Sequence, residues 1–577
     1  MAPRAAGRPA RLVGSLAGAA VLVAAVTALS RFAGFGRWLV FARTVGADCV
    51  GDVYTTANTI PTVAFEAVAG GALAGAVVPV VASALARGDR VAAARTASAL
   101  VTWTVIVLVP VALVVTLAAE PLAGFFLGRG SSDGCTGPDA TAAGARMLRV
   151  FAPQVPAYGL AVVLGGVLQA QRRFLAPALA PLLSSVVVAA SYVIFAGLAG
   201  ADRGDVGALN RGAELVLAGG TTLGVVLLAG SQLPALASGG LRLRPSVRFP
   251  PGAAVRARRL AAAGVAALLA QQLAVLVVLR LANAYGAPGS LTLYQYAWAL
   301  YLLPYAVLAV PLATAAQPLL AERAHVGDRA GYAAATAITA RAVVLASAAG
   351  AAALAAAAVP ISRLFLAGAP GSAPESLPGG ALSPGTLVAG LLAFAPGLLG
   401  YGLAAHLSRA LYVVDRGRDA ARALVSGWVC VALVDAALVP LLGAAWVVPA
   451  LGVGNSVGML VAAALLVAAV RRGGSAGPQD GRGASEGLRR TAAVAVLGAL
   501  LAAAVGAGVA ALGHVGLPGP GLSGAGAAGS LGSAPRLAGE ALLAALAAAS
   551  ALVVLAGCVA RADRDTWRDL RRRVGRG

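Results

Sequence analysis

Two arginines, Arg31 and Arg37, interrupt an otherwise apolar stretch, SRFAGFGRWLV at residues 30–40 of this 577-residue chain. If the stretch crosses a membrane, each charge is costly there, and such groups usually line a bundle interior or a watery cavity. The guanidinium group matches the geometry of phosphate and stays charged at any relevant pH. The pair therefore indicates a membrane-embedded site for an anionic, phosphorylated ligand.

Other ionisable residues also fall within apolar runs, and each has two interpretations. At about 1.5 Å per helical residue, Arg31 and Glu66 would lie at similar depth, so a structural ion pair competes with ligand binding. Arg280 either lines the same cavity or extends to the membrane surface. Asp435 is either a proton or cation site or a group that caps or pairs, whereas His406 is expected to be a hydrogen-bonded packing residue.

The composition requires these residues to be positioned by membrane-spanning helices. The chain is 59% hydrophobic and 11% charged, with a mean hydropathy of +0.85, which is more apolar surface than a soluble domain can bury. Runs this long and continuously apolar predict spanning helices, not barrel strands, so we expect an all-helical bundle. Fourteen spans are expected, at about 15–44, 52–82, 96–119, 144–171, 175–199, 212–235, 260–286, 292–320, 338–360, 386–411, 422–443, 445–470, 490–513 and 539–560.

The arginines outside the spans predict the orientation of the chain. The net charge is +22, but the basic residues gather in alternate loops, as the positive-inside rule describes, and not in a nucleic-acid-binding patch. With fourteen spans, both termini would be cytoplasmic. The basic tail, RADRDTWRDLRRRVGRG, would then lie against anionic lipid head groups.

An internal repeat divides the expected spans. FAPQVPAYGLA at 151–161 recurs as FAPGLLGYGLA at 394–404, and ARGDR at 86–90 is echoed by HVGDR at 325–329. Similar offsets at two places predict two homologous six-span lobes, a parallel repeat with a site between the lobes. The expected organisation is an N-lobe at 1–235, a cytoplasmic linker at 236–258, a C-lobe at 259–470, a second linker at 471–489, two extra spans at 490–560 and a basic tail at 561–577.

Several classes of function lack their signals in the sequence. There is no Walker A motif for direct use of ATP, and the four cysteines lack metal-ligand spacing. Cys430 and Cys558 fall within spans, whereas Cys49 and Cys135 fall in expected external loops, where a disulfide between them is one possibility. The first apolar run has a basic start like that of a signal peptide, but it continues as a span, so we expect it to be retained.

SRFAGFGRWLVFARTVGA, followed by GDVYTTANTIPTVAFEAVAGGALAGAVVPVVA, resembles the start of the MurJ (MviN) family of lipid II flippases. LQAQRRFLAPALAPLLSSVVV at 168–188 resembles the family's segment between spans 4 and 5. The resemblance implies the fold of the multidrug/oligosaccharidyl-lipid/polysaccharide exporter superfamily, with Arg31 and Arg37 in a central cationic cavity. It matches Asp52 to the Asp that begins span 2, and it implies that the last two spans form a groove for the lipid tail.

The chain also departs from the family pattern. The family's arginine pair in span 2 falls on Phe65 and Glu66, its Glu before Gly-Ala falls on Gly70, and its span-8 arginine falls on Trp298 within YQYAWAL. The acidic residue after the second span-1 arginine is Trp38. Half of the expected cationic cavity is therefore replaced, and a Glu is added.

The resemblance implies a flippase, not an enzyme, that moves an undecaprenyl-pyrophosphate-linked peptidoglycan precursor by alternating access in the bacterial cell membrane. The substrate-binding residues would be Arg31, Arg37, Asp52, Glu66 and Arg280, and Asp435 would be a possible ion or proton site. No cofactor is expected, although transport can be coupled to the membrane potential or to a cation. Expected partners are the lipid-linked precursor, membrane lipids and the cell-wall synthesis machinery. Alternative functions are export of another lipid-linked cargo, ion-coupled export of small molecules, and a non-transporting membrane scaffold.

Overall fold

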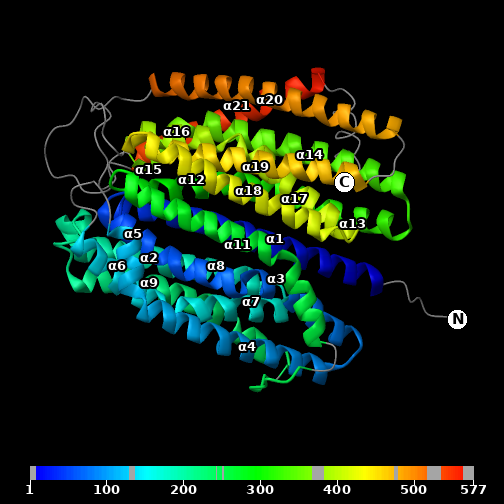
Figure 1. Ribbon diagram of the computed structural model, residues 1–577, viewed down its shortest axis with the longest axis horizontal. Helices are drawn as coiled ribbons and strands as arrows, with labels where there is room; N and C mark the ends of the chain where they lie inside the picture. Colours follow the sequence, from blue (N-terminus) through cyan, green and yellow to red (C-terminus); the bar gives the residue numbers. More distant parts are fainter. Residues whose placement is uncertain are drawn as a thin grey trace. The chain divides into compact units, whose positions relative to one another are not determined.

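The computed structural model of the chain describes residues 8–128, 137–241, 243–249, 253–366, 383–473, 478–515 and 534–562, and within these ranges the regular structure is helical (Figure 1). The expected all-helical class is confirmed. A long helix pairs its backbone N–H and C=O groups internally, which the hydrocarbon core of a membrane requires. The bounds of the helices follow the apolar runs of the sequence.

Eleven helical segments among the described residues are long and apolar enough to cross a membrane. A twelfth span results if Pro384–Phe394 and Gly397–Val413, which are bent by 40° at their junction, are counted together. The first two expected spans fall on helices that are not among these twelve. A multi-spanning architecture is therefore confirmed, and the count of fourteen stays a prediction.

The chain divides into two compact units, and the boundary falls between Leu268 and Leu269. Unit 1 comprises the described residues up to this boundary. Its elements are α1 (Arg8–Thr44), α2 (Cys49–Phe65), the π-helix η1 (Glu66–Gly70), α3 (Gly71–Ala86), α4 (Arg90–Leu117), α5 (Ala119–Leu127), α6 (Pro138–Phe151), α7 (Gln154–Ala170), α8 (Leu175–Ala199), η2 (Gly200–Gly204), α9 (Arg211–Gly230), α10 (Leu233–Ala237) and the first half of α11 (Ala253–Tyr285).

Unit 2 comprises the rest of α11 and the described residues that follow it. Its other elements are α12 (Ser290–Pro304), the π-helix η3 (Tyr305–Ala309), α13 (Val310–His325), α14 (Arg329–Ala356), α15 (Ala358–Leu366), α16 (Pro384–Phe394), α17 (Gly397–Val413), α18 (Gly417–Leu438), η4 (Val439–Leu441), η5 (Ala444–Trp446), α19 (Val447–Gly473), α20 (Pro478–Val515) and α21 (Ala534–Ala562). Helices α20 and α21 pack on each other and on α14, which places the C-terminal pair in this unit (Figure 1).

The order of elements in unit 1 recurs in unit 2. Four consecutive elements of unit 1 have counterparts in unit 2 that begin and end 239 residues later. The pairs are η1 and η3, α3 and α13, α4 and α14, and α5 and α15. A π-helix is rare, so its recurrence at the same position of both units is strong evidence for a structural repeat. The internal duplication read from two short motifs thus extends over many helices.

The echo of ARGDR in HVGDR marks the same turn in the two units. Gly88 and Gly327 adopt positive φ angles of 75° and 72°, which suit glycine because it has no Cβ. Next in the chain, the carboxylates of Asp89 and Asp328 accept hydrogen bonds of 2.8 Å from the N–H groups of Ala92 and Gly331, and so cap α4 and α14. The motif is therefore a helix stop followed by a helix start.

The glycine of the repeated YGL motif permits close helix packing in each unit. A Cβ on Gly159 of α7 would collide with Leu108 and Thr104 of α4. A Cβ on Gly402 of α17 would collide with Ser347 of α14 and lie 3.3 Å from Val343. The positions contacted in α14 are the counterparts, 239 residues later, of those in α4. The repeated motif therefore preserves the same helix contact twice.

The turn between α1 and α2 contains a buried polar group. Asp48 caps α2 through a hydrogen bond of 3.1 Å from the N–H of Gly51, and burial raises the pKa of this carboxyl to about 6. Cys49 is disulfide-bonded, and Cys430 and Cys558 carry free thiols. Cys135, the other cysteine expected on the external side, lies outside the described residues.

Candidate functional site

The two arginines that motivate the site project from α1 in unit 1. The hydroxyl of Ser30, next to Arg31, donates hydrogen bonds to the carbonyl oxygens of Val26 at 2.9 Å and of Ala178 in α8 at 2.7 Å. This contact attaches α1 to α8 at the level of the site. Arg31 is exposed and Arg37 is partly buried.

Arg37 lies beside a group of aromatic side chains and hydroxyls. Its guanidinium carbon is 5.7 Å from the centroid of the Trp38 ring, a cation–π distance. Its charge also acts on the phenols of Tyr54, Tyr158 and Tyr192, which come from α2, α7 and α8. Arg37 is therefore surrounded by polar groups, and no acidic residue in the described part of the chain forms an ion pair with it.

A buried hydrogen-bond network fixes two of these tyrosines. The hydroxyl of Tyr54 lies 2.8 Å from that of Tyr192 and 2.8 Å from the hydroxyl of Thr221 in α9. Thr221 in turn donates to the carbonyl oxygen of Leu217. Because all three hydroxyls are satisfied inside unit 1, this side of the site is rigid.

Neither Arg31 nor Arg37 forms an ion pair with any residue that the structure describes, and the same holds for Glu66. The Arg31–Glu66 pair considered from the sequence therefore does not form. A guanidinium group in an apolar environment is costly unless an anion compensates it. Within unit 1, α1 thus presents two cationic groups without a protein counter-charge.

The two acidic residues of α2 and η1 lie in different settings. Asp52 is buried in the first turn of α2, where the partial positive charge of the helix N-terminus favours a carboxylate. Glu66 begins the π-helix η1 and is partly buried, and a Cβ on Gly70 would collide with its carboxylate. Gly70 therefore leaves the space that the Glu66 side chain occupies.

Unit 2 contains the most deeply buried acidic group among the predicted residues. Asp435 of α18 has no exposed surface, and neither carboxylate oxygen has a hydrogen-bond partner within the described ranges. A Cβ on Gly454 of α19 would collide with this carboxylate. The adjacent Asn455 also has its side-chain amide N and O buried without partners. A carboxyl in such a place must either keep its proton or hold a cation.

The remaining predicted residues of unit 2 are less informative. Arg280 is partly buried in α11, five residues before the end of that helix, and both of its interpretations stay predictions. The Nε2 of His406 lies 2.9 Å from the hydroxyl of Thr339 in α14. The expectation that His406 is a hydrogen-bonded packing residue is confirmed.

Four charged residues within helices were missed by the sequence interpretation. Arg341 of α14 lies against Gly487 of α20, and Arg409 of α17 donates to the carbonyl of Ala405, one turn earlier. Both fall within a few residues of the ends of expected spans, where an arginine is easily taken for a membrane-surface residue. Arg146 of α6 and Glu214 of α9 form a bidentate pair at 2.7–3.1 Å. Their separation of 68 residues gave no local signal.

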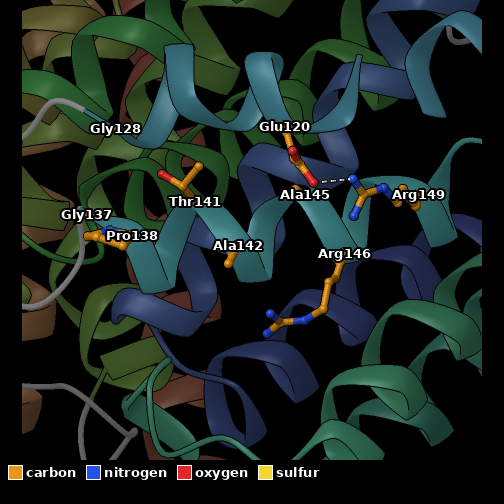
Figure 2. A pocket seen from close by; sticks show the side chains of 9 residues that line it. All are labelled: Glu120, Gly128, Gly137, Pro138, Thr141, Ala142, Ala145, Arg146 and Arg149. Atoms are coloured by element: carbon orange, nitrogen blue, oxygen red, sulfur yellow. Dashed lines mark hydrogen bonds and ion pairs between the residues drawn. The ribbon is translucent and has the colours of Figure 1, made fainter. Parts of the chain in front are cut away.

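A cavity of about 610 Å³ lies in unit 1. Figure 2 shows Arg146 and Arg149 projecting from α6, with Glu120 of α5 paired to Arg149 at 2.7 Å. Its lining residues are Glu120, Gly128, Gly137, Pro138, Thr141, Ala142, Ala145, Arg146 and Arg149. None of the predicted site residues lines it, and both arginines already have acidic partners.

Metal binding finds no support in the described residues, which bring together no group of three or more His, Cys, Asp or Glu side chains. Unit 1 contains the predicted residues Arg31, Arg37, Asp52 and Glu66, and unit 2 contains Arg280 and the buried carboxyl of Asp435. Arginines without acidic partners could bind an anion, and a buried carboxyl without a hydrogen-bond partner could hold a proton or a cation.

The fold is that of known membrane transporters. A solved structure of lipid II flippase MurJ in an inward closed conformation aligns with a TM-score of 0.66 at 16% identity, covering 94% of this chain and 100% of that chain. An inward-facing multidrug resistance MATE family transporter of the MOP superfamily aligns with a TM-score of 0.58 at 15% identity, covering 78% of this chain and 98% of that one. The chain is thus a multi-pass membrane protein with a transporter fold.

The family follows from the sequence comparison. A profile described as "Lipid II flippase MurJ" matches residues 41–516, and the chain belongs to this family. A probable lipid II flippase MurJ from Synechocystis sp. is 31% identical over 244 residues, which cover 41% of this chain and 43% of that relative. The chain thus matches less than half of that relative's length. Arg31 and Arg37 precede the residues that the family profile matches.

Proposed function

We propose that this protein moves a lipid-linked, pyrophosphate-bearing peptidoglycan precursor, lipid II, across the bacterial inner membrane by alternating access. Family membership supports the substrate class, and the observation that carries the site is the pair of arginines on α1 without acidic partners. Guanidinium groups bind phosphate in bidentate geometry, so Arg31 and Arg37 would bind the pyrophosphate. Arg280 would add a third cation, and the lipid tail would stay in the membrane.

The two acidic residues predicted for the site in unit 1 have separate roles in this proposal. Asp52, buried at the start of α2, would hold the end of that helix, and Glu66 would contact a polar or cationic part of the cargo head group. No covalent bond changes, so the protein would act as a transporter and not as an enzyme. The arginine-rich loops support a topology with both termini in the cytoplasm. Membrane lipids and cell-wall synthesis proteins are the proposed partners.

Asp435 would couple transport to a proton or cation. Its buried carboxyl lacks a hydrogen-bond partner in the described part of the chain, so its charge state must change with the ion that it holds. The membrane potential would act on the same step, because moving one charge through 100 mV is worth about 2.3 kcal/mol.

Complementation tests the proposal directly. A bacterium depleted of its own flippase would receive the wild type, Arg31→Ala, Arg37→Ala, or Arg211→Ala, an exposed arginine of the same unit, as the matched control. Rescue by the wild type and the control, but by neither α1 variant, is expected. Rescue by all variants would favour a scaffold, and failure of the wild type would favour another cargo.

Ion-coupled export of small cations is the second candidate, because Glu66 and Asp435 both lack ion-pair partners among the described residues. A cation exporter uses such lone acidic groups to bind its cargo. Uptake of a cationic dye into inverted vesicles distinguishes a cation exporter from a lipid II flippase. The flippase proposal expects no uptake above that of vesicles without the protein.

A further inference from the structure

Helix α12 and the π-helix η3 carry an unusual density of aromatic side chains. Aromatic residues make up 5% of the chain, but Tyr294, Trp298, Tyr301 and Tyr305 recur here at intervals of four, three and four residues. These intervals place the four rings on one side of a helix. A fifth ring, Tyr401 of α17, packs against this side.

The rings form a continuous ladder within unit 2. Tyr294 and Trp298 stack with centroids 6.3 Å apart and planes 10° apart, and Trp298 stacks on Tyr301 at 5.4 Å. Tyr401 then joins Tyr301 at 5.9 Å to Tyr305 at 4.4 Å. Each ring is therefore held in place by at least one neighbour.

The ladder is only partly covered by the protein. Tyr301 is fully buried, but Tyr294, Trp298, Tyr305 and Tyr401 are partly exposed. We call these four side chains the aromatic face. Trp298 and Tyr401 also pack against the cluster formed by Ala274, Trp428, Val431 and Met459, which anchors them. Phe394 of α16 packs against Tyr294 and Trp298 as well, so the aromatic face is a rigid surface of partly exposed side chains.

The chemistry of the aromatic face suits neither lipid nor an ordinary core. Three of its four members carry phenolic hydroxyls, which need a polar partner inside a membrane. The carboxyl of Asp435 is a charged group of unit 2 that lies near enough to interact with the phenol of Tyr294. An apolar ring surface edged with hydroxyls matches a sugar, whose C–H face lies on the negative ring face while its hydroxyls hydrogen-bond at the edge.

We propose that the aromatic face is a carbohydrate-binding surface that stacks the sugar rings of the lipid-linked cargo. This inference rests on the proposed function and assigns a second part of the cargo to a second set of residues. The glycan part of the cargo binds the aromatic face, which lies wholly within unit 2.

The test compares two ligands that differ only in their sugars. Binding of undecaprenyl pyrophosphate carrying the disaccharide, and of the sugar-free undecaprenyl pyrophosphate, is measured on the full-length protein in nanodiscs. Trp298→Leu removes the ring, Trp298→Phe keeps an aromatic surface, and Trp446→Leu removes an exposed tryptophan of the same unit as the matched control. Tyr294→Leu repeats the test one turn away.

The wild type is expected to bind the glycosylated lipid about tenfold more tightly than the sugar-free lipid, a preference of the size that aromatic stacking provides. Trp298→Leu and Tyr294→Leu should lose most of this preference and leave sugar-free binding within about twofold, whereas Trp298→Phe and Trp446→Leu should keep it. Equal losses for both lipids in Trp298→Leu, or no sugar preference in the wild type, would overturn the carbohydrate surface alone. A wild type that binds neither lipid would overturn the proposed function and this inference together.

Discussion

Helix α2 with η1 in unit 1, and α12 with η3 in unit 2, are built alike but carry opposite chemistry. Each contains a proline, Pro61 or Pro304, and each continues into a π-helix of five residues. At the spacing of 239 residues that aligns the two π-helices, Thr55, Thr59, Thr62 and Glu66 correspond to Tyr294, Trp298, Tyr301 and Tyr305. One stripe consists of hydroxyls and a carboxylate, and the other consists of rings.

This difference indicates that the two units kept the same backbone structure after duplication, whereas their side chains changed. The contacts of Gly159 with α4 recur at Gly402 with α14, because helix packing tolerates little change in volume. Apart from the buried Thr55 and Tyr301, the residues of the stripes on α2 and α12 are partly exposed, so their side chains could change with the ligand. Charge has diverged in the same way: α1 carries cations without acidic partners, and α18 carries a buried acid.

The largest expected effect comes from removing the charges of Arg31 and Arg37. Arg31→Gln with Arg37→Gln should weaken binding of a pyrophosphate lipid by about 100-fold or more, because each hydrogen bond to a charged group contributes about 1.5–3 kcal/mol. Arg280→Gln in unit 2 should cost less, since Arg280 already interacts with other groups of the protein. Binding assays on the purified double variant and on Arg280→Gln measure the two losses of affinity for the pyrophosphate lipid. A larger loss in Arg280→Gln would place the main anion contact in unit 2.

The second expected effect tests the helix contact that both units share, made by Gly159 in unit 1 and by Gly402 in unit 2. Gly159→Ala should destabilise unit 1 by about 1–3 kcal/mol, because the new Cβ overlaps Leu108 and Thr104 side chains. Gly402→Ala should cost less, because its closest contact is the small hydroxyl of Ser347. Thermal unfolding of the two variants in detergent shows which one loses more stability. Equal stabilities with the wild type would show that α7 and α17 can shift to make room.

A smaller effect is expected at the buried acid of unit 2. Asp435→Asn keeps the shape of the side chain but holds neither an exchangeable proton nor a cation, so transport should fall about tenfold. It should also lose its dependence on pH or on the cation supplied. Asp419→Asn is the matched control on the same helix, since Asp419 is paired with Arg416. An unchanged ion dependence in Asp435→Asn would exclude this residue from coupling.

The sequence predicts the membrane-spanning helices well because a bilayer admits few structures and marks them with long apolar runs. It also reveals the repeat, since Gly159 and Gly402 or Asp89 and Asp328 must recur wherever the same packing and capping recur. Arg31 and Arg37 stand out as charges in an apolar run.

Other parts of the site depend on contacts between distant residues. The ladder of rings needs the helical register and the contribution of Tyr401 from another helix, and the Arg146–Glu214 pair joins α6 to α9. The sequence also does not predict that Arg31 and Glu66 remain unpaired, because two residues at similar depth need not lie on facing sides of their helices. The spacing of residues in the sequence gives their positions along a helix, but it does not give the residues of other helices that they contact.

The smallest effect concerns the turns that precede α2 and α12. Asp48 caps α2 with a buried carboxyl of pKa about 6, whereas α12 begins after Gly289, at a φ of 87°, with no side-chain cap. A folded-state pKa above the ordinary value of 3.8 means that the folded protein binds the proton more tightly than the unfolded chain. This contribution to stability is complete below about pH 4 and is lost as the pH rises through about 6.

Asp48→Asn keeps an N-cap acceptor without a charge to bury, so it should be more stable than the wild type by about 1 kcal/mol at pH 8 and similar to it at pH 4. Thermal unfolding in detergent at both values checks this, with Asp328→Asn, an exposed cap in unit 2, as the control. A wild type whose stability relative to Asp48→Asn does not change across this window would mean that water reaches the carboxyl. The two turns would then differ in shape but not in electrostatic cost.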